Sequence, residues 1–173
     1  RSFLRQSPPR GPVLAEWGDD FPAFAAGFPG VEALPWLQDL ARLEAAWTDS
    51  YHAADAAPLT LADLGQCDLG APLCPHPAAR LVASLWPIGT IWSAHRGGPP
   101  APNPKGAEAV LLCRPGLEVA LHLVPPGDLA FLTALFQRQP PAEAALALPD
   151  PEQDFGRALA GLTALGAFAG EPR

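Results

Sequence analysis

The spacing of hydrophobic residues changes along the chain, and this change predicts the order of its elements. In the first part, aromatic and aliphatic residues recur three or four positions apart, which is the period of one face of an α-helix. This spacing predicts an amphipathic helix from about residue 34 to residue 56, which Pro58 ends. A stripe of this kind is usually part of a core rather than a cofactor site. Its members are Trp36, Leu40, Leu43, Trp47 and Tyr51.

Shorter elements are predicted on both sides of this helix. Asp20 can cap a short helix over residues 21–28. Residues 60–79 are interpreted as a loop that contains one helical turn over residues 61–64. We therefore expect the first part of the chain to be helical.

From residue 81 onward, β-branched and aromatic residues become frequent and predict strands. Residues 81–92 contain a proline and a glycine within such a run, so we expect a bent or edge strand there. Residues 109–113 and 117–124 flank an Arg-Pro-Gly turn, and the second segment alternates apolar with polar positions. These two segments predict a half-buried antiparallel hairpin, with His122 on its polar side.

Three helical segments are predicted to follow the hairpin. The first lies near residues 129–136, and the second begins at Pro141. The third begins with Asp150 as its N-cap and Pro151 at its first position, and it ends near Gly166.

These elements together predict an α+β fold. A small sheet with a trio of helices contains the parts of a winged helix-turn-helix, although here the sheet comes first. We predict a helical part with a long amphipathic helix over residues 1–64. A winged-helix-like domain is predicted over residues 65–173.

Composition narrows the class of protein. Of the 173 residues, 23 are Pro and 16 are Gly, so we expect short elements joined by stiff turns. A hydrophobic content of 49% with five Trp is enough to bury a core. No apolar run reaches the roughly 18 residues that cross a bilayer, so no membrane partner is expected. The three cysteines are an odd number, which disfavours a disulfide framework and favours a reducing, cytoplasmic location.

The net charge of −7 bears on the DNA-binding function that a helix-turn-helix suggests. DNA binding needs basic groups that neutralise phosphates. The predicted third helix instead begins with Asp150, Glu152 and Asp154, which would repel phosphate where a recognition helix meets DNA. The sequence therefore disfavours nucleic acid as a partner, and a DNA-binding transcriptional regulator is kept only as the alternative to a protein-binding domain.

Candidate catalytic and metal-binding residues are few. The motifs GxSxG, GxxxxGK[ST], HExxH and GxGxxG do not occur, so we expect no enzymatic activity. Cys67, Cys74 and His76 could supply metal ligands, but no fourth ligand at the spacing of a zinc site completes the set. We expect no metal or other cofactor in this chain, and a metallochaperone that uses these three residues is kept as an alternative.

Several short sequence segments, spread along the chain, together resemble a known protein family. The most specific is LPWLQDLARLEAAW at 34–47, which follows GDDFPAF at 18–24 and precedes YHAAD at 51–55. The later pieces are His76-Pro77, SLWP at 84–87, Ile91-Trp92, the turn at 114–116, and Asp154-Phe155 with Leu159 and Leu162. Together they resemble the HvfC/BufC family of bacterial proteins over nearly the whole chain. Family members carry an additional N-terminal helical domain, and we expect only its tail here, at residues 2–9.

The resemblance implies a role as the partner of an enzyme. Members of this family form complexes with multinuclear non-heme iron-dependent oxidative enzymes that modify cysteines in ribosomally made precursor peptides, in pathways that make copper-binding peptides. In that arrangement the iron and the chemistry belong to the enzyme, whereas the partner protein binds the enzyme and the Cys-containing precursor. Small winged-helix-like domains in such pathways bind a leader segment along a strand edge.

Three residues are candidates for the binding surface. Trp92 and Arg114 lie in the predicted strand region and are residue types favoured at interfaces, so we assign them to the peptide- or enzyme-binding surface. An ordinary core position remains an equal alternative for Trp92. His76 is assigned either to the interface or to hydrogen bonds within its own loop.

Three further residues match the family's DLARLE segment. They are Asp39, Arg42 and Glu44. Charged side chains three or four positions apart on a helix can pair with each other. We therefore expect these residues to form salt bridges within or between helices rather than contacts with a partner.

Overall fold

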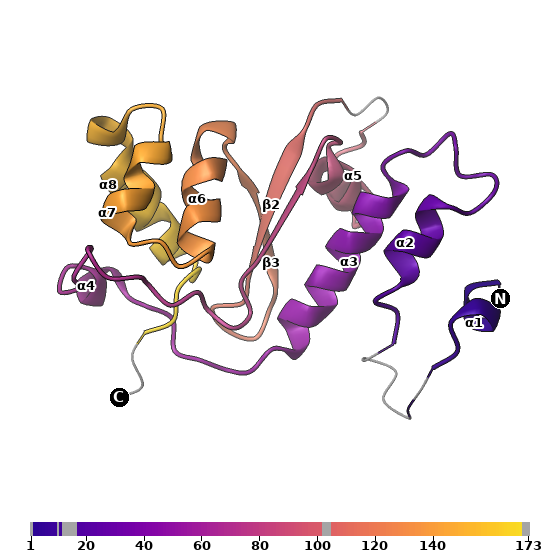
Figure 1. Cartoon of the computed structure of the whole chain (residues 1–173), viewed down its shortest axis with the longest axis horizontal. Coiled ribbons are helices and arrows are strands. Elements are labelled where there is room, and N and C mark those ends of the chain that lie inside the picture. Colours follow the sequence, from indigo (N-terminus) through magenta and orange to yellow (C-terminus); the bar gives the residue numbers. More distant parts are fainter. Residues whose placement is uncertain (1, 10, 12–16, 102–104, 171–173) are drawn as a thin grey trace.

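The computed structural model is an α+β fold built on one three-stranded antiparallel sheet (Figure 1). The structure describes residues 2–9, 11, 17–101 and 105–170. The strands pair in chain order, as β1, Arg80–Ser84, β2, Glu108–Cys113, and β3, Ala120–Val124. β2 is the central strand and is buried along almost its whole length. The sheet therefore has β1 and β3 as its two edges.

Two helices cover one face of the sheet. They are α3, Leu37–His52, and α5, Ile88–His95. Leu43 of α3 is fully buried in a core that also contains Val82 of β1 and Val110 of β2. Ile88 of α5 belongs to the same core, so both helices are held to the sheet by apolar packing.

The helices that follow the sheet cover its other face, so the sheet lies between two helical layers (Figure 1). Fully buried Phe131 and Phe168 belong to the second core, together with Leu111 and Cys113 of β2. The elements of this layer are a 3-10 turn at Pro126–Asp128, α6 at Leu129–Phe136, α7 at Pro141–Ala144, a 3-10 turn at Ala145–Ala147, and α8 at Pro151–Ala164.

The remaining helices are short. α1, Ser2–Gln6, and α2, Phe21–Ala26, belong to the N-terminal segment, and α2 packs on α3 (Figure 1). α4, Leu61–Leu64, contacts α8. None of the helices in the described part of the chain combines the length and the apolar character that crossing a bilayer requires.

The α+β class, the long helix, the hairpin and the three final helices are confirmed. The Asp150 carboxylate accepts from the N–H of Gln153 at 3.2 Å, which is the predicted N-cap of α8. Gly166 ends that helix with a φ of 76°, which glycine adopts without strain. Asp20 occupies the N-cap position of α2, but its side chain makes no capping bond.

The prediction of one bent strand over residues 81–92 is wrong beyond Ser84. Pro87 directly precedes α5 instead of bending a strand. The Glu108 carboxylate caps this helix, since it accepts from the N–H of Thr90 at 2.9 Å and also from the Thr90 hydroxyl. A carboxylate stabilises a helix N-terminus because the free N–H groups there carry positive partial charge. The β-branched and aromatic composition of residues 81–92 favoured a strand. The residue that caps the helix, Glu108, lies far along the chain and outside this segment.

The aromatic stripe of α3 is less uniformly buried than predicted. Leu43 is fully buried, and Trp47 packs half-buried against the same core. Tyr51, at the end of the helix, is 52% exposed. Leu40 does not belong to this core and instead lines a pocket on the outer side of α3.

The predicted division at residue 64 lies between residues that pack in one core. Leu43 precedes this position and Val82 and Val110 follow it, yet all three belong to one core. α3 is therefore an integral layer of the sheet structure.

Candidate peptide-binding edge of the sheet

The outer edge of β3 is the feature of the sheet most open to a partner. In the described part of the chain, β3 pairs with β2 on one side only and no strand follows it on the other. An unpaired edge presents a row of backbone N–H and C=O groups, to which another extended chain can bind. The outer edge of β3 is thus a ready position for a fourth strand.

Two exposed leucines lie beside this edge. Leu123, within β3, is 54% exposed, and Leu117, in the turn before β3, is 88% exposed. The strand ends at Pro125 and Pro126, which cannot donate backbone hydrogen bonds. The edge therefore combines free backbone groups with apolar side chains over a short, defined length.

The β1 edge is more strongly engaged with the rest of the molecule. The Arg80 guanidinium at its start donates to the carbonyl of Pro77 at 2.6 Å. Ser84 at its end donates to the Asp39 carboxylate of α3 at 2.6 Å. By contrast, no side-chain hydrogen bond involves the residues of β3 within the described ranges. This difference favours β3 as the binding edge.

Helix α5 lies close against β3 because Gly89 has no side chain. A Cβ at this position would lie 2.6 Å from Leu123 Cδ2 and 2.9 Å from Val110 Cγ2. Both distances are shorter than side-chain atoms tolerate. Gly89 therefore sets the position of Leu123 on the surface beside the edge.

His122 and Cys113 are titratable groups with shifted pKa values in the strands of this site. Burial lowers the pKa of His122 on β3, so its imidazole is neutral at pH 7. Burial raises the pKa of the Cys113 thiol on β2 to about 12, so this group is a neutral core side chain and not a thiolate nucleophile. His122 and Cys113 thus add no charge to the backbone and apolar contacts that the site offers.

Arg114 lies beside the edge, but its side chain points into the molecule. The residue is only 7% exposed, and its guanidinium binds the end of α3. Its Nε donates to the carbonyl of Ser50 at 3.0 Å and its Nη2 to that of Ala53 at 2.6 Å. Its Nη1 donates to the Asp55 carboxylate at 2.8 Å. These bonds neutralise the negative C-terminal end of α3, so Arg114 is placed as a helix cap.

Trp92 lies on α5, because residues 88–95 form a helix and not the predicted strand. Its ring packs half-buried against the core between α3 and the sheet. The Arg96 guanidinium lies 4.6 Å from the centre of the ring, on the solvent side, and pairs with Glu44 at 3.2 Å. These contacts match the alternative in which Trp92 occupies a core position, and the guanidinium adds a cation–π contact to its ring.

His76 is buried within its loop. Its Nδ1 accepts from the N–H of Ala78 at 3.1 Å, and its Nε2 lies 3.0 Å from the carbonyl oxygen of Ala56. Both ring nitrogens therefore have partners inside the molecule. Of the two alternatives for His76, these contacts match hydrogen bonding within the loop.

The three residues of the DLARLE segment form the expected salt bridges and hydrogen bonds. Arg42 pairs with Asp39 within α3 at 3.1 Å, and Glu44 pairs with Arg96, the residue that directly follows α5. Asp39 also accepts from Ser84, which links α3 to the end of β1. These contacts hold α3 in place over the sheet.

The proposed metal ligands do not come together. Cys74 is exposed, Cys67 is half-buried, and His76 is buried with both ring nitrogens bonded. No group of three or more His, Cys, Asp or Glu side chains in the described ranges could hold a metal ion.

Sequence reasoning missed Leu117 and Leu123. The alternation of apolar and polar positions over residues 117–124 predicts a half-buried hairpin, in which apolar residues at every second position usually face a core. Leu117 instead lies in the turn before β3, and Leu123 lies on the edge strand, where it stays half exposed. Pro125-Pro126 directly after residue 124 indicates that the sheet does not continue beyond this segment.

Comparison with known proteins adds no relative. No protein-family model matches the chain, and no curated protein matches it. The resemblance to the HvfC/BufC family therefore stays a prediction.

Proposed function

We propose that this chain is a non-catalytic partner protein that binds a ribosomally made, Cys-containing precursor peptide together with the multinuclear non-heme iron-dependent oxidative enzyme that modifies it. The unpaired outer edge of β3, beside Leu117 and Leu123, is the observation that supports this proposal. An extended peptide adding there would pair its backbone with β3 and place alternate side chains on the leucines. The sequence resemblance is the basis for naming the peptide and the enzyme.

In this proposal the chain contributes position rather than chemistry. Binding the peptide and the enzyme at once makes the encounter between them intramolecular, which raises the effective concentration of the cysteines at the iron centre. The iron and the oxidative steps belong to the enzyme. The peptide must remain mobile enough beyond the edge for its cysteines to reach that centre.

A change at Leu123 tests the peptide site. Lysine on an edge strand opposes the addition of another strand, so Leu123→Lys should weaken binding of the precursor encoded next to this chain's gene. We expect at least a tenfold loss of affinity, or about 1.4 kcal/mol, in fluorescence anisotropy with the labelled peptide. Leu146→Lys is the matched control, because Leu146 is also exposed, at 81%, but lies in the turn after α7.

Two further measurements test the arrangement. Hydrogen exchange of the β3 amides should slow when the peptide binds, and omission of this chain should reduce modification of the precursor cysteines by the enzyme. The proposal fails if Leu123→Lys leaves peptide affinity unchanged and the enzyme neither co-elutes with the chain nor depends on it. Duplex DNA binding that weakens steeply with salt would instead favour the regulator alternative.

A further inference from the structure

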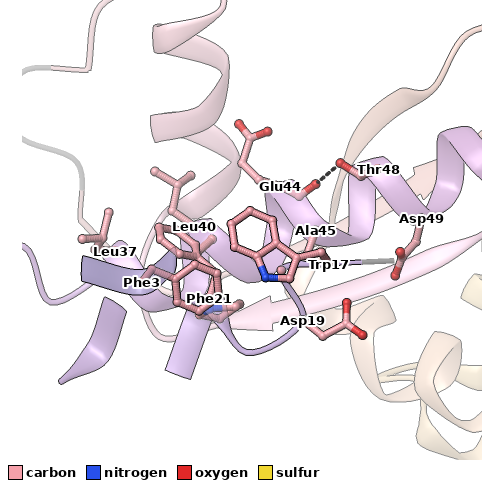
Figure 2. Close-up of a pocket in the computed structure, with 13 residues that line it drawn as sticks. Phe3, Trp17, Asp19, Phe21, Leu37, Leu40, Glu44, Ala45, Thr48 and Asp49 are labelled. Atoms are coloured by element: carbon pink, nitrogen blue, oxygen red, sulfur yellow. Dashed lines mark hydrogen bonds between the residues drawn. The ribbon is translucent and has the colours of Figure 1, made fainter. Parts of the chain in front are cut away.

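A pocket of about 490 Å³ lies on the outer side of α3, at a distance from the β3 edge. One wall is a stripe of α3 that includes Leu37, Leu40 and Ala45. The other is the N-terminal segment, where Phe3, Trp17 and Phe21 contribute aromatic rings (Figure 2). The pocket is therefore apolar along its length.

The stripe of α3 is long enough to form a groove. Its lining residues extend from Leu37 to Asp49. At about 1.5 Å per residue this is about 18 Å, or more than three helical turns. The lining face of α3 thus matches a short helix in length.

The opposite wall is held in place by contacts of its own. The Trp17 indole Nε1 donates to the carbonyl of Ser7 at 2.7 Å. The ring of Phe3 lies 5.2 Å from that of Trp17 and 5.2 Å from that of Phe21. The aromatic side chains therefore form a preformed surface rather than a loose cluster.

The rim of the pocket is acidic. Asp19, Glu44 and Asp49 line it, and none of the described residues that line it is a lysine or arginine. Glu44 is paired with Arg96 at 3.2 Å. Asp19 and Asp49 have no ion pair with any residue in the described ranges, and in Figure 2 both carboxylates lie at the end of the pocket next to Trp17. Among the described residues that line the pocket there is thus no basic side chain, and the rim presents two carboxylates available to a cation.

We propose that this groove binds a basic amphipathic helix of a partner protein. The apolar face of that helix fills the space between Leu40, Ala45 and the aromatic wall, and its lysine or arginine side chains pair with Asp19 and Asp49. A helix fits better than an extended peptide, because no strand edge in the described residues lines the groove and a helix satisfies its own backbone groups. This site is independent of the β3 edge, since α3 lies between the groove and the sheet.

Synthetic peptides provide the test. The probe is a short helical peptide with leucines on one face and lysines on the other. Its comparisons are a scrambled peptide of the same composition and a peptide with glutamates in place of the lysines. We expect the amphipathic leucine–lysine peptide to bind with one-to-one stoichiometry in fluorescence anisotropy, at least about tenfold more tightly than either comparison. Equal binding of the scrambled peptide would mean charge attraction alone and would overturn the proposal.

Variants of the full chain locate the site. Ala45→Trp fills the groove, and Asp49→Lys reverses one rim charge on the exposed surface, so each should weaken the peptide at least about fivefold. Glu143→Lys makes the same charge change on α7, across the sheet, and should have no effect. Circular dichroism checks that each variant is folded. If Ala45→Trp does not fold, Asp49→Lys alone tests the location of the site.

Nuclear magnetic resonance gives a reading that does not depend on variants. Bound peptide should shift the indole N–H resonance of Trp17 and the amides of α3, and leave those of β3 unchanged. Shifts confined to β3, or affinity that Asp49→Lys and Glu143→Lys change equally, would overturn the proposal.

Discussion

Gly166 ends α8 in a backbone conformation that depends on having no side chain. Its φ of 76° disfavours any residue with a Cβ. A Cβ there would also lie 2.9 Å from the Cβ of Pro115, in the turn between β2 and β3. At the scale of single residues, this glycine lets the end of the last helix lie directly against the turn beside the proposed peptide edge.

We expect Gly166→Ala to lower the free energy of unfolding by about 2 kcal/mol or more, since left-handed strain and the contact with Pro115 add. Gly161→Ala is the control within the same helix, because nothing lies within 4 Å of its Cβ position. It should raise stability by about 0.5–1 kcal/mol, as alanine favours a helix interior. Urea unfolding followed by circular dichroism measures both changes. If Gly166→Ala and Gly161→Ala changed the free energy of unfolding in the same direction, this explanation of Gly166 would be wrong.

At the scale of elements, α3 is the helix with the most varied anchoring. Leu43 buries it in the core, Asp39 and Glu44 bond it to β1 and α5, and Arg114 caps its C-terminus. The cap is buried, whereas the Asp55 side chain that pairs with Arg114 is 93% exposed. Exposed ion pairs contribute little, so the bonds to the helix carbonyls should dominate.

Arg114→Ala should therefore reduce the free energy of unfolding by about 3 kcal/mol, because it leaves the buried carbonyl of Ser50 and the part-buried carbonyl of Ala53 without donors. Asp55→Asn should change it by less than about 0.5 kcal/mol. Arg114→Lys should fall between them, since lysine keeps the charge without the fork of donors. If Arg114→Ala keeps full stability in urea unfolding and loses only peptide binding, Arg114 is a binding residue and not a cap.

At the scale of the whole molecule, the sheet is stabilised from both faces. The core under α3 and α5 contains Val82, Val110 and Leu112, and the core under α6 to α8 contains Leu111 and Cys113. Successive residues of β2 point to opposite faces, so one strand supplies both cores. Removal of either helical layer would leave apolar side chains of β2 in water.

Truncation tests this dependence. A chain of residues 65–173 lacks α3 and exposes Val82 and Val110, so it should unfold without a cooperative transition and bind a hydrophobic dye. A chain of residues 31–173 keeps α3 and should retain a cooperative transition in thermal circular dichroism. Cooperative unfolding of residues 65–173 alone would instead support a domain boundary at residue 64.

The sequence by itself determined the local structure and the class of the fold. The stripe of α3, the alternation of the hairpin, the Asp150 cap and the Gly166 stop depend on neighbours within a few positions, so periodicity and capping chemistry were sufficient. The salt bridges of Asp39, Arg42 and Glu44 were also predictable from the charges of these side chains and their spacing on a helix. The strand predicted over residues 81–92 failed because the cap of α5 comes from Glu108.

Only the tertiary structure decided which of the candidate residues are exposed. Arg114 and His76 have the chemistry of binding residues, but the packing of α3 and of the loop turned them inward. Leu117 and Leu123 belong to the apolar positions of the predicted hairpin, yet both are exposed, one in the turn before β3 and the other on the edge strand. Exposure depends on the order of strands and on which face each helix covers. Those are long-range relations that local periodicity does not encode.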